Sequence, residues 1–548
     1  MFLGLISVSD HCSVIREKGR KRNNLEIGLH LNVSKCFLIA NSSHELSING
    51  VSVPFINYST SSFRFLGCFL GFRDHIVNDL NSYLKSIELE LDEILKLEIE
   101  KHLKFFLLKV CYSGKVTHLL RTTDPLLSYE FCRHFNKRRT NFLSELLQVD
   151  SNVLKNHIFC RPDLGGVGFT SSKYLTKAAF IGGAKNFVFE FSNRYNGRQN
   201  LLSTTNSDYL VAVRRELESL PSEIWASCFS SDIMEIPARE LISLKFAFKK
   251  LQNRLVKTFE EMDYSVRLSL AKTNNPSFAN FLIDVKDSSA TALFTQIPQV
   301  YGLLLNDHQW TTAMRLRCFL WHNNLPHELV CKCSQRLTFH HLLNCKYFIT
   351  YRSVLHDGVR DQLHAMCKSH KVESFVEPLL RKLAENEDDD SSGQRRADVS
   401  IPSSTGRLHV VDVVTVDVCK STADKFCFSE TSPLDNAEQG KRLKYEKPLS
   451  KVKSVHHVKY ELCPFAVSLF GNLGKSALNF LQDFKVLVSG RHNKLFDSSF
   501  WTNRLVFTIF KMVPLVISRS LEAVSAVLES KAGVRLDESD VCFDDIDF

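Results

Sequence analysis

Residues 397–418 read ADVSIPSSTGRLHVVDVVTVDV, and this stretch decides the fold expected for the C-terminal part of the chain. Two apolar runs flank the turn signal PSSTG, and this arrangement predicts a β-hairpin. With the turn centred near Thr405, antiparallel pairing sets Asp398 opposite Asp412, because both lie seven residues from the centre. Residues 408–418 are nearly all apolar or β-branched, which is typical of a central strand buried on both faces.

Asp398 and Asp412 together form a candidate metal site. Directly opposed residues point to the same face with Cβ atoms about 5 Å apart, so the two carboxylates would repel each other without a cation between them. Their oxygens are hard ligands of the kind that Mg²⁺ or Mn²⁺ takes, and a buried aspartate is costly unless it is paired or metal-bound. Asp417 has the opposite strand parity and is expected on the other face. The alternative is a chance hairpin with solvated aspartates.

A basic segment after the hairpin is expected to complete this site. Residues 436–445 read NAEQGKRLKY, and as a helix they place Lys441, Lys444 and Tyr445 on one face. A lysine beside a metal-bound phosphate can offset the charge that develops in the transition state. Lys441 is the preferred candidate, but the sequence leaves Lys444 open. An ordinary basic helix face is the alternative.

A second metal site is predicted upstream of the hairpin. Cys331 and Cys333 form a CxC pair, and residues 340–345 read HHLLNC. Three thiols and one imidazole suit tetrahedral zinc, so Cys331, Cys333, Cys345 and either His340 or His341 are expected to bind Zn²⁺. The spacing does not separate the two histidines, and a cluster of free thiols in an amphipathic helix is the alternative.

The composition describes a globular protein with a mild positive charge. Of 548 residues 44% are hydrophobic, and 69 Lys+Arg against 60 Asp+Glu give a net charge of +9. This composition excludes a chain disordered throughout and permits a nucleic-acid partner. The 16 cysteines do not form a dense disulfide framework, no signal peptide precedes them, and no apolar run is long enough to span a bilayer. These features predict an intracellular protein with reduced thiols and no membrane contact.

The pattern along the chain predicts a mixture of strands and helices. Residues 26–72 read as short strands separated by turns. Residues 74–160 read as helices, and the first is expected to run from Asn78 or Asp79 to residue 110. Residues 175–325 also read as mostly helical. The acidic runs at 385–390 and 537–548 are expected to be solvated.

A basic cluster lies within the first helical region, where residues 133–139 read RHFNKRR. The side chains expected to contact nucleic-acid phosphates are Arg133, Lys137, Arg138 and Arg139. Phe135 among them would allow aromatic stacking on a base.

Taken together, these residues resemble the C-terminal part of a non-LTR retrotransposon polyprotein of the restriction-like-endonuclease class. Members of this class carry a reverse transcriptase, a CCHC zinc knuckle and then a PD-(D/E)xK-type nuclease. The family's nuclease motif is Lys/Arg-Pro-Asp, an acidic residue after a short spacer, and a helix with a shifted lysine and a tyrosine. Here Arg396-Ala397-Asp398, thirteen residues, Asp412 and the helix with Lys441 and Tyr445 fit this motif, with alanine in place of proline. Residues 461–481 (ELCPFAVSLFGNLGKSALNFL) resemble the family's closing segment.

The N-terminal part carries a looser resemblance to the family's polymerase. Residues 24–36 (NLEIGLHLNVSKC) look like the palm segment that follows the polymerase active site, and 63–71 (FRFLGCFLG) look like the strand that grips the primer end. Residues 161–169 (RPDLGGVGF) look like the post-thumb segment. The family's Tyr-x-Asp-Asp turn is missing, since residues 1–23 hold only Asp10. The chain is therefore expected to lack the polymerase core and not to reverse-transcribe on its own.

The resemblance implies an α+β multidomain fold with seven segments. They are 1–73, a partial reverse-transcriptase palm remnant; 74–160, a helical thumb-like domain; 161–325, a helical connector; 326–350, a zinc knuckle; 351–396, a helix and acidic linker; 397–500, an α/β restriction-like endonuclease domain; and 501–548, C-terminal helices and an acidic tail.

The function implied by the resemblance is a Mg²⁺- or Mn²⁺-dependent endonuclease that nicks target DNA, so that the new 3′-OH primes reverse transcription. Asp398 and Asp412 would hold the metal, and Lys441, Lys444 and Tyr445 would serve catalysis. Target DNA and retroelement RNA would be the partners, in the nucleus with a cytoplasmic phase. Two alternatives stay open: a zinc-stabilised DNA/RNA-binding module, and an inactive truncated retroelement product.

Overall fold

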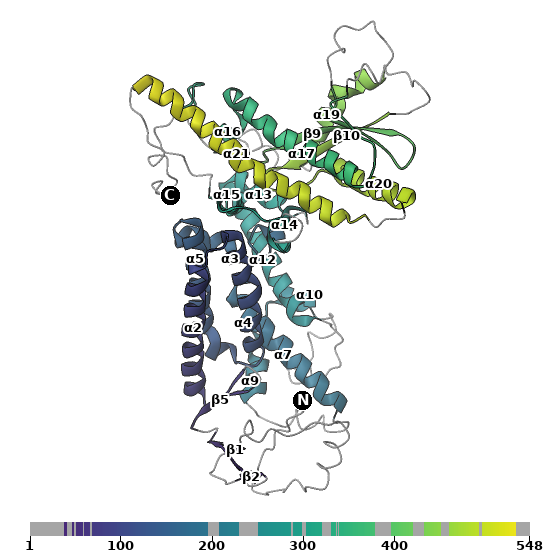
Figure 1. Cartoon of the computed structure of the whole chain (residues 1–548). Helices are drawn as coiled ribbons and strands as arrows, with labels where there is room; N and C mark the ends of the chain where they lie inside the picture. Colours follow the sequence, from purple (N-terminus) through teal and green to yellow (C-terminus); the bar gives the residue numbers. More distant parts are fainter. Residues whose placement is uncertain are drawn as a thin grey trace. The chain divides into compact units, whose positions relative to one another are not determined.

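The structure is a computed structural model, and the part of the chain that it describes forms two compact units (Figure 1). The first unit takes residues 1–92, 114–136 and 172–255, and the second takes 93–113, 137–171 and 256–548. The described residues are 38–40, 46–48, 51–57, 60–65, 68–194, 208–228, 250–286, 289–298, 303–320, 330–335, 337, 339–378, 396–419, 432–450, 460–492 and 496–532. The predicted palm segment at 24–36 and both acidic runs lie outside them. Among the described helices, none has the length and hydropathy needed to cross a bilayer.

The first unit combines short strands with helices. Its strands form three two-stranded pairs, β1 with β4 (parallel), β2 with β3 and β5 with β6 (both antiparallel). They are β1 (Leu38–Ala40), β2 (Leu46–Ile48), β3 (Val51–Val53), β4 (Phe55–Asn57), β5 (Ser62–Phe65) and β6 (Cys68–Gly71). Its helices are most of α2 (Arg73–Lys96) and of α4 (Ser113–Leu120), the first half of α5 (Pro125–Leu147), then α7 (Ser172–Arg194), α9 (Asp208–Glu218) and α10 (Ser222–Cys228). The strands expected within 26–72 are therefore present from residue 38 onward.

The long helix expected to reach residue 110 is interrupted, so that prediction is wrong. Helix α2 begins at Arg73, ahead of the predicted caps, because β6 ends at Gly71 with φ +132°, a conformation that L side chains rarely adopt. It ends at Lys96, and α3 (Lys101–Leu107) starts anew before the π-helical turn η2 (Leu108–Tyr112). The backbone N–H of Lys101 donates to Asp307 Oδ1 at 2.7 Å. A distant acidic side chain thus satisfies an N–H that a continuous helix would have used.

The second unit is built from many helices and one four-stranded sheet. Before the sheet come α3, η2, the second half of α5, α6 (Ser151–Ile158), η3 (Pro162–Leu164), α12 (Leu251–Asn274), α13 (Pro276–Asp284), η5 (Ser289–Thr291), α14 (Ala292–Thr295), α15 (Asp307–Arg317), α16 (Phe339–Asn344), η7 (Lys346–Phe348) and α17 (Ile349–Ser369). The sheet and its later helices are β7 (Phe375–Val376), β8 (Val399–Pro402), β9 (Leu408–Val416), α19 (Pro433–Ser450), β10 (Tyr460–Ser468), α20 (Lys475–His492) and α21 (Ser498–Ala532). The described protein is thus mostly helical with small sheets.

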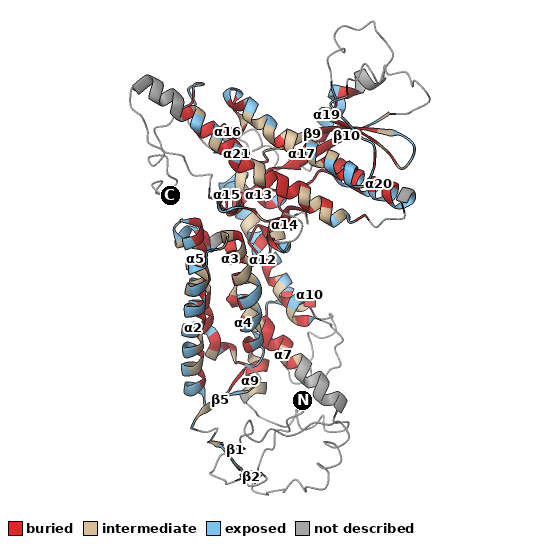
Figure 2. Ribbon diagram, viewed as in Figure 1, coloured by how far each residue is buried: buried red, intermediate tan, exposed pale blue. Residues whose placement is uncertain are grey.

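The sheet has the strand order β10-β9-β8-β7. Strands β8 and β9 form the predicted hairpin, and their register pairs Val399 with Val411 and Pro402 with Leu408. Strand β10 lies parallel to β9 on its other side, and α19 connects the two as a crossover. Six of the nine residues of β9 are buried, and its centre is drawn as buried in Figure 2.

Different helices cover the two faces of this sheet. Val411 and Val413 point into the main core, with Leu355 from α17, Phe480 from α20 and Leu505 from α21. Val410 points to the other face, where it packs with Ala397 and with Tyr445 of α19. Successive residues of a strand alternate between the two faces, so Asp412 shares the face of Val410 and meets α19. The fold thereby brings the predicted helix over the predicted carboxylates.

Candidate functional site

The β8–β9 register, continued by one residue, sets Asp398 opposite Asp412 as predicted. The backbone N–H of Asp398 donates to Val411 O at 3.1 Å. The Asp398 side chain turns toward β9, since its Oδ2 accepts a hydrogen bond from the N–H of Val413. Asp398 and Asp412 are therefore directly opposed neighbours at one end of the hairpin.

Asp412 is buried, with 3% of the residue exposed, and two side chains of α19 contact its carboxylate. Lys441 Nζ lies 2.6 Å from Oδ2, and the hydroxyl of Tyr445 donates to Oδ1 at 3.1 Å. Burial raises the pKa of Asp412, the nearby Asp398 adds to this effect, and Lys441 only partly offsets it. The spacing of Lys441 and Tyr445, one helical turn apart, lets both reach the same carboxylate.

Lys444 takes a different position. Its ammonium lies 4.9 Å from the centroid of the Tyr445 ring, and the residue is exposed. It still faces the site closely enough to lower the pKa of Asp412 by its charge. Of the two lysines that the sequence left open, Lys441 is the one in contact with a carboxylate.

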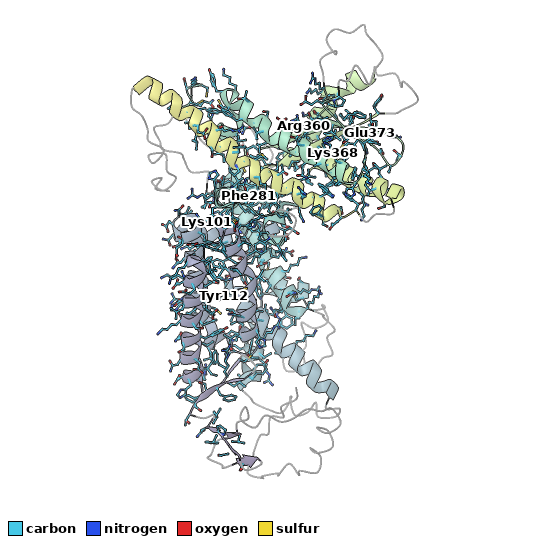
Figure 3. The ribbon with its side chains drawn as sticks, viewed as in Figure 1. Lys101, Tyr112, Phe281, Arg360, Lys368 and Glu373 are labelled. Carbon is cyan, nitrogen blue, oxygen red and sulfur yellow. The ribbon has the colours of Figure 1, made fainter. Side chains whose placement is uncertain are left out.

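The structure adds His356, which sequence reasoning missed. This residue belongs to α17, and its Nε2 lies 2.8 Å from Asp398 Oδ2. Arg360, labelled on the same helix in Figure 3, pairs with Glu377 at 2.6 Å, and the backbone N–H of Glu377 donates to Asp398 O. No local spacing links His356 to Asp398, which follows it by 42 residues, so only the folded chain reveals the contact.

The donor set of this site fits a hard divalent cation. Asp398 and Asp412 offer carboxylate oxygens from neighbouring strands, and among the described residues Asp398 Oδ1 accepts no hydrogen bond. The Lys441 ammonium balances part of the charge of Asp412, which is the electrostatic role that a bound cation would share. Asp417 points elsewhere, as expected from its parity, and accepts a hydrogen bond from Asn344 of α16 at 2.9 Å.

The Cys/His cluster converges on one point. Ligand atoms of Cys331, Cys333, His341 and Cys345 all lie within 4.8 Å of one another. The Sγ atoms of Cys331 and Cys345 are 3.7 Å apart, and Cys333 Sγ is 3.3 Å from His341 Nε2. A tetrahedral zinc with Zn–S of about 2.3 Å needs sulfurs roughly 4 Å apart, so the cluster could bind a metal such as zinc.

Local structure explains how four ligands from one short segment meet. The CxC pair lies in a tight turn. Ser334 adopts the left-handed region at φ +65°, and its N–H donates to Cys331 O. His341 lies in α16, and the N–H of Cys345 donates to His341 O where that helix ends. Burial lowers the pKa of His341, which favours the neutral imidazole that a metal requires. Of the two candidate histidines, the structure brings His341 to the cluster, and the side chain of His340 lies outside the described residues.

The basic cluster on α5 corrects part of the predicted nucleic-acid contact. Arg139 is buried at 2% exposure, donates to Thr170 O and stacks on two phenylalanine rings, so it cannot reach a phosphate. Phe135 is buried as well, which excludes the predicted base stacking. Arg133 is exposed and paired with Glu130, Arg138 is paired with Glu145, and Lys137 is exposed. The reason is helical periodicity, which turns positions 135 and 139 to the packed face of α5.

Comparison with known proteins gives no relative to support or oppose these interpretations, since neither a protein-family model nor a curated protein matches the chain.

Proposed function

We propose that the second unit is a metal-dependent DNA endonuclease of the PD-(D/E)xK type, from a non-LTR retrotransposon protein. The single observation that carries the proposal is the contact of Lys441 and Tyr445 with the buried carboxylate of Asp412, directly across the hairpin from Asp398. These are the four positions of the nuclease motif that the sequence resembles. They come from two strands and the crossover helix that follows them, so their meeting depends on the whole βαβ arrangement.

Each side chain has a distinct part in the proposed reaction. Asp398 and Asp412 would hold Mg²⁺ or Mn²⁺, which when bound polarises a phosphate and lowers the pKa of water. The Lys441 ammonium would offset negative charge on the scissile phosphate. The Tyr445 hydroxyl holds Asp412 Oδ1 and so keeps the buried carboxylate in one orientation. Lys444, at the exposed edge, would contact the DNA backbone.

The proposal includes zinc at the second cluster and nucleic-acid partners. Cys331, Cys333, His341 and Cys345 would hold Zn²⁺. Target DNA and retroelement RNA would be bound by cations spread over the chain, among them Arg133, Lys137 and Arg138. A DNA target implies work in the nucleus, after synthesis in the cytoplasm.

The proposal is tested by nicking of supercoiled plasmid with the purified, zinc-loaded chain in Mg²⁺ or Mn²⁺. Wild type should nick, whereas Asp412→Ala and Asp398→Ala should not, because each loses a carboxylate metal ligand. Both variants should still retard DNA on a gel, since binding rests on several separate phosphate contacts. Asp361→Ala removes an exposed acid of α17 and is the matched control that should nick normally.

Two outcomes decide against this assignment. Nicking that survives in both aspartate variants would mean that the nuclease site is elsewhere. A wild-type chain that binds DNA without nicking it under either metal would replace the nuclease with the binding-module interpretation.

The same assay separates the two lysines. Lys441→Ala should lower the nicking rate by roughly 10²–10³-fold, the usual effect of removing a charge-stabilising donor, because its ammonium contacts Asp412. Lys444→Ala should act mainly on DNA affinity and its salt dependence, since Lys444 lies over a ring at the edge of the site. Equal loss of nicking in both variants would contradict the assignment of Lys441.

A further inference from the structure

The position of His356 suggests a function beyond packing. Its side chain is 30% exposed and lies on α17, while Asp398 directly precedes β8 on a separate part of the chain. The contact between His356 Nε2 and Asp398 Oδ2, at 2.8 Å, joins two groups that are both only partly exposed. Helix α17 therefore delivers a hydrogen-bond donor to one carboxylate of the candidate metal site.

The two hydrogen bonds to Asp398 both use the same oxygen. Oδ2 accepts from His356 Nε2 and from the N–H of Val413, whereas Oδ1 accepts no hydrogen bond among the residues that the structure describes. Two donors from different directions fix the rotation of the carboxylate plane. They also leave Oδ1 as the oxygen with lone pairs available to a cation.

Further contacts hold the histidine itself in place. His356 Nδ1 lies 3.3 Å from Asp357 Oδ1, and Asp357 pairs with Arg360 at 3.0 Å. Arg360 also pairs with Glu377, whose backbone N–H donates to the carbonyl of Asp398 at 2.9 Å. The side chain and the backbone of Asp398 are thus both tied to the same face of α17.

We propose that His356 is a positioning residue, which orients Asp398 so that Oδ1 binds the divalent cation of the nuclease. This inference rests on the proposed function, because it assumes that Asp398 is a metal ligand. Groups that orient a metal ligand from behind commonly contribute about 10–100-fold to metal affinity or activity.

The experiment measures Mn²⁺ binding to the zinc-loaded chain in the absence of DNA, by the electron paramagnetic resonance signal of free Mn²⁺. His356→Ala should weaken binding by about 10–100-fold, and a higher Mn²⁺ concentration should restore its nicking rate. His356→Gln should bind nearly as well as wild type, because its amide N–H₂ lies where Nε2 lies in histidine. His364→Ala, on the same face of α17 but bonded to Ser374, is the matched control and should bind like wild type.

The possible failures are distinguishable. If Asp398→Ala and Asp412→Ala bind Mn²⁺ as wild type does, the nuclease metal site itself is wrong. If those variants lose Mn²⁺ but His356→Ala keeps wild-type affinity, only the positioning role is overturned. If His356→Gln is as weak as His356→Ala, the imidazole acts by packing and the inference also fails.

Discussion

Buried charged side chains in this protein contact polar, charged or aromatic groups, because an unpaired buried charge is costly. Asp412 meets an ammonium and a hydroxyl, and Arg139 meets a carbonyl and two aromatic rings. Glu260 of α12 is an exception, since it is 1% exposed and neither carboxylate oxygen accepts a hydrogen bond among the described residues. Burial raises the pKa of Glu260 to about 7, although the charge of Arg161 opposes the shift.

This raised pKa predicts a pH-dependent stability. A carboxyl whose pKa is higher in the folded than in the unfolded chain adds to the unfolding free energy, and it does so in full below its ordinary pKa of 4.5. This contribution is lost as the pH rises through the folded-state pKa of about 7. Glu260→Gln should therefore match wild type near pH 5 and exceed its unfolding free energy by roughly 1–3 kcal/mol near pH 8.5. Urea unfolding at both pH values checks this, with Glu261→Gln, a half-exposed neighbour, as control. Parallel pH profiles of wild type and Glu260→Gln would contradict the prediction.

At the scale of elements, the β8–β9 hairpin is held at both ends. The site end is held by α17 and α19, and the turn end is held by Asp483 of α20. Asp483 accepts hydrogen bonds from the N–H and hydroxyl of Ser404 and lies 2.8 Å from His409 Nε2. Burial alone would raise the pKa of Asp483, but these donors outweigh it and hold that pKa below its usual range. The turn is therefore anchored to the helix by a charged group.

Removal of this anchor should loosen the hairpin. Asp483→Ala leaves the Ser404 and His409 donors without their acceptor, and should cost roughly 1–3 kcal/mol of unfolding free energy at neutral pH. Hydrogen exchange should show faster exchange of the amides of β8 and β9 in this variant. Gln482→Ala alters the exposed neighbour on the same helix and should leave exchange unchanged. Unaltered hairpin protection in Asp483→Ala would show that the packed strands need no anchor.

At the scale of the whole molecule, the Cys/His cluster packs in the same core as β9, the strand that carries Asp412, within the second unit. Cys331 and Cys345 pack in the same hydrophobic cluster as Val411 and Val413 of β9. Two polar contacts reinforce this link: Asn344 donates to Asp417, and Arg352 donates to Thr415 O at 2.9 Å. The strand that carries Asp412 is thus attached, at its other end, to the helix that carries His341.

Disruption of the proposed zinc site should consequently affect the proposed nuclease site, although the two sites are not in contact. Cys345→Ser should lower the metal content below one per chain and lower Tm by roughly 5–15 °C, because structural zinc contributes directly to folding energy. Nicking should fall with it, as β9 loses its support. Cys111→Ser changes an exposed cysteine outside the cluster and should leave all three measurements at wild-type values. A Cys345→Ser chain that is as stable and active as wild type would separate the two sites.

The sequence by itself was sufficient for features that depend on local spacing. Symmetry about Thr405 predicted the pairing of Asp398 with Asp412, and helical period placed Lys441 and Tyr445 on one face. The Cys/His cluster could also be predicted from the sequence, because its four ligands lie within fifteen residues of the chain. In each case a turn, a strand or a helix of known geometry links the residues, so their separation in sequence sets their separation in space.

Only the tertiary structure decided which faces are covered and which distant groups meet. It buried Phe135 and Arg139, and it ended α2 at Lys96. It also selected Lys441 over Lys444 and brought His356 to Asp398. These outcomes depend on packing between elements that are far apart in the chain. Residue type and local periodicity do not specify that packing, because the same helix can turn its charged side to solvent, to another helix or to a carboxylate.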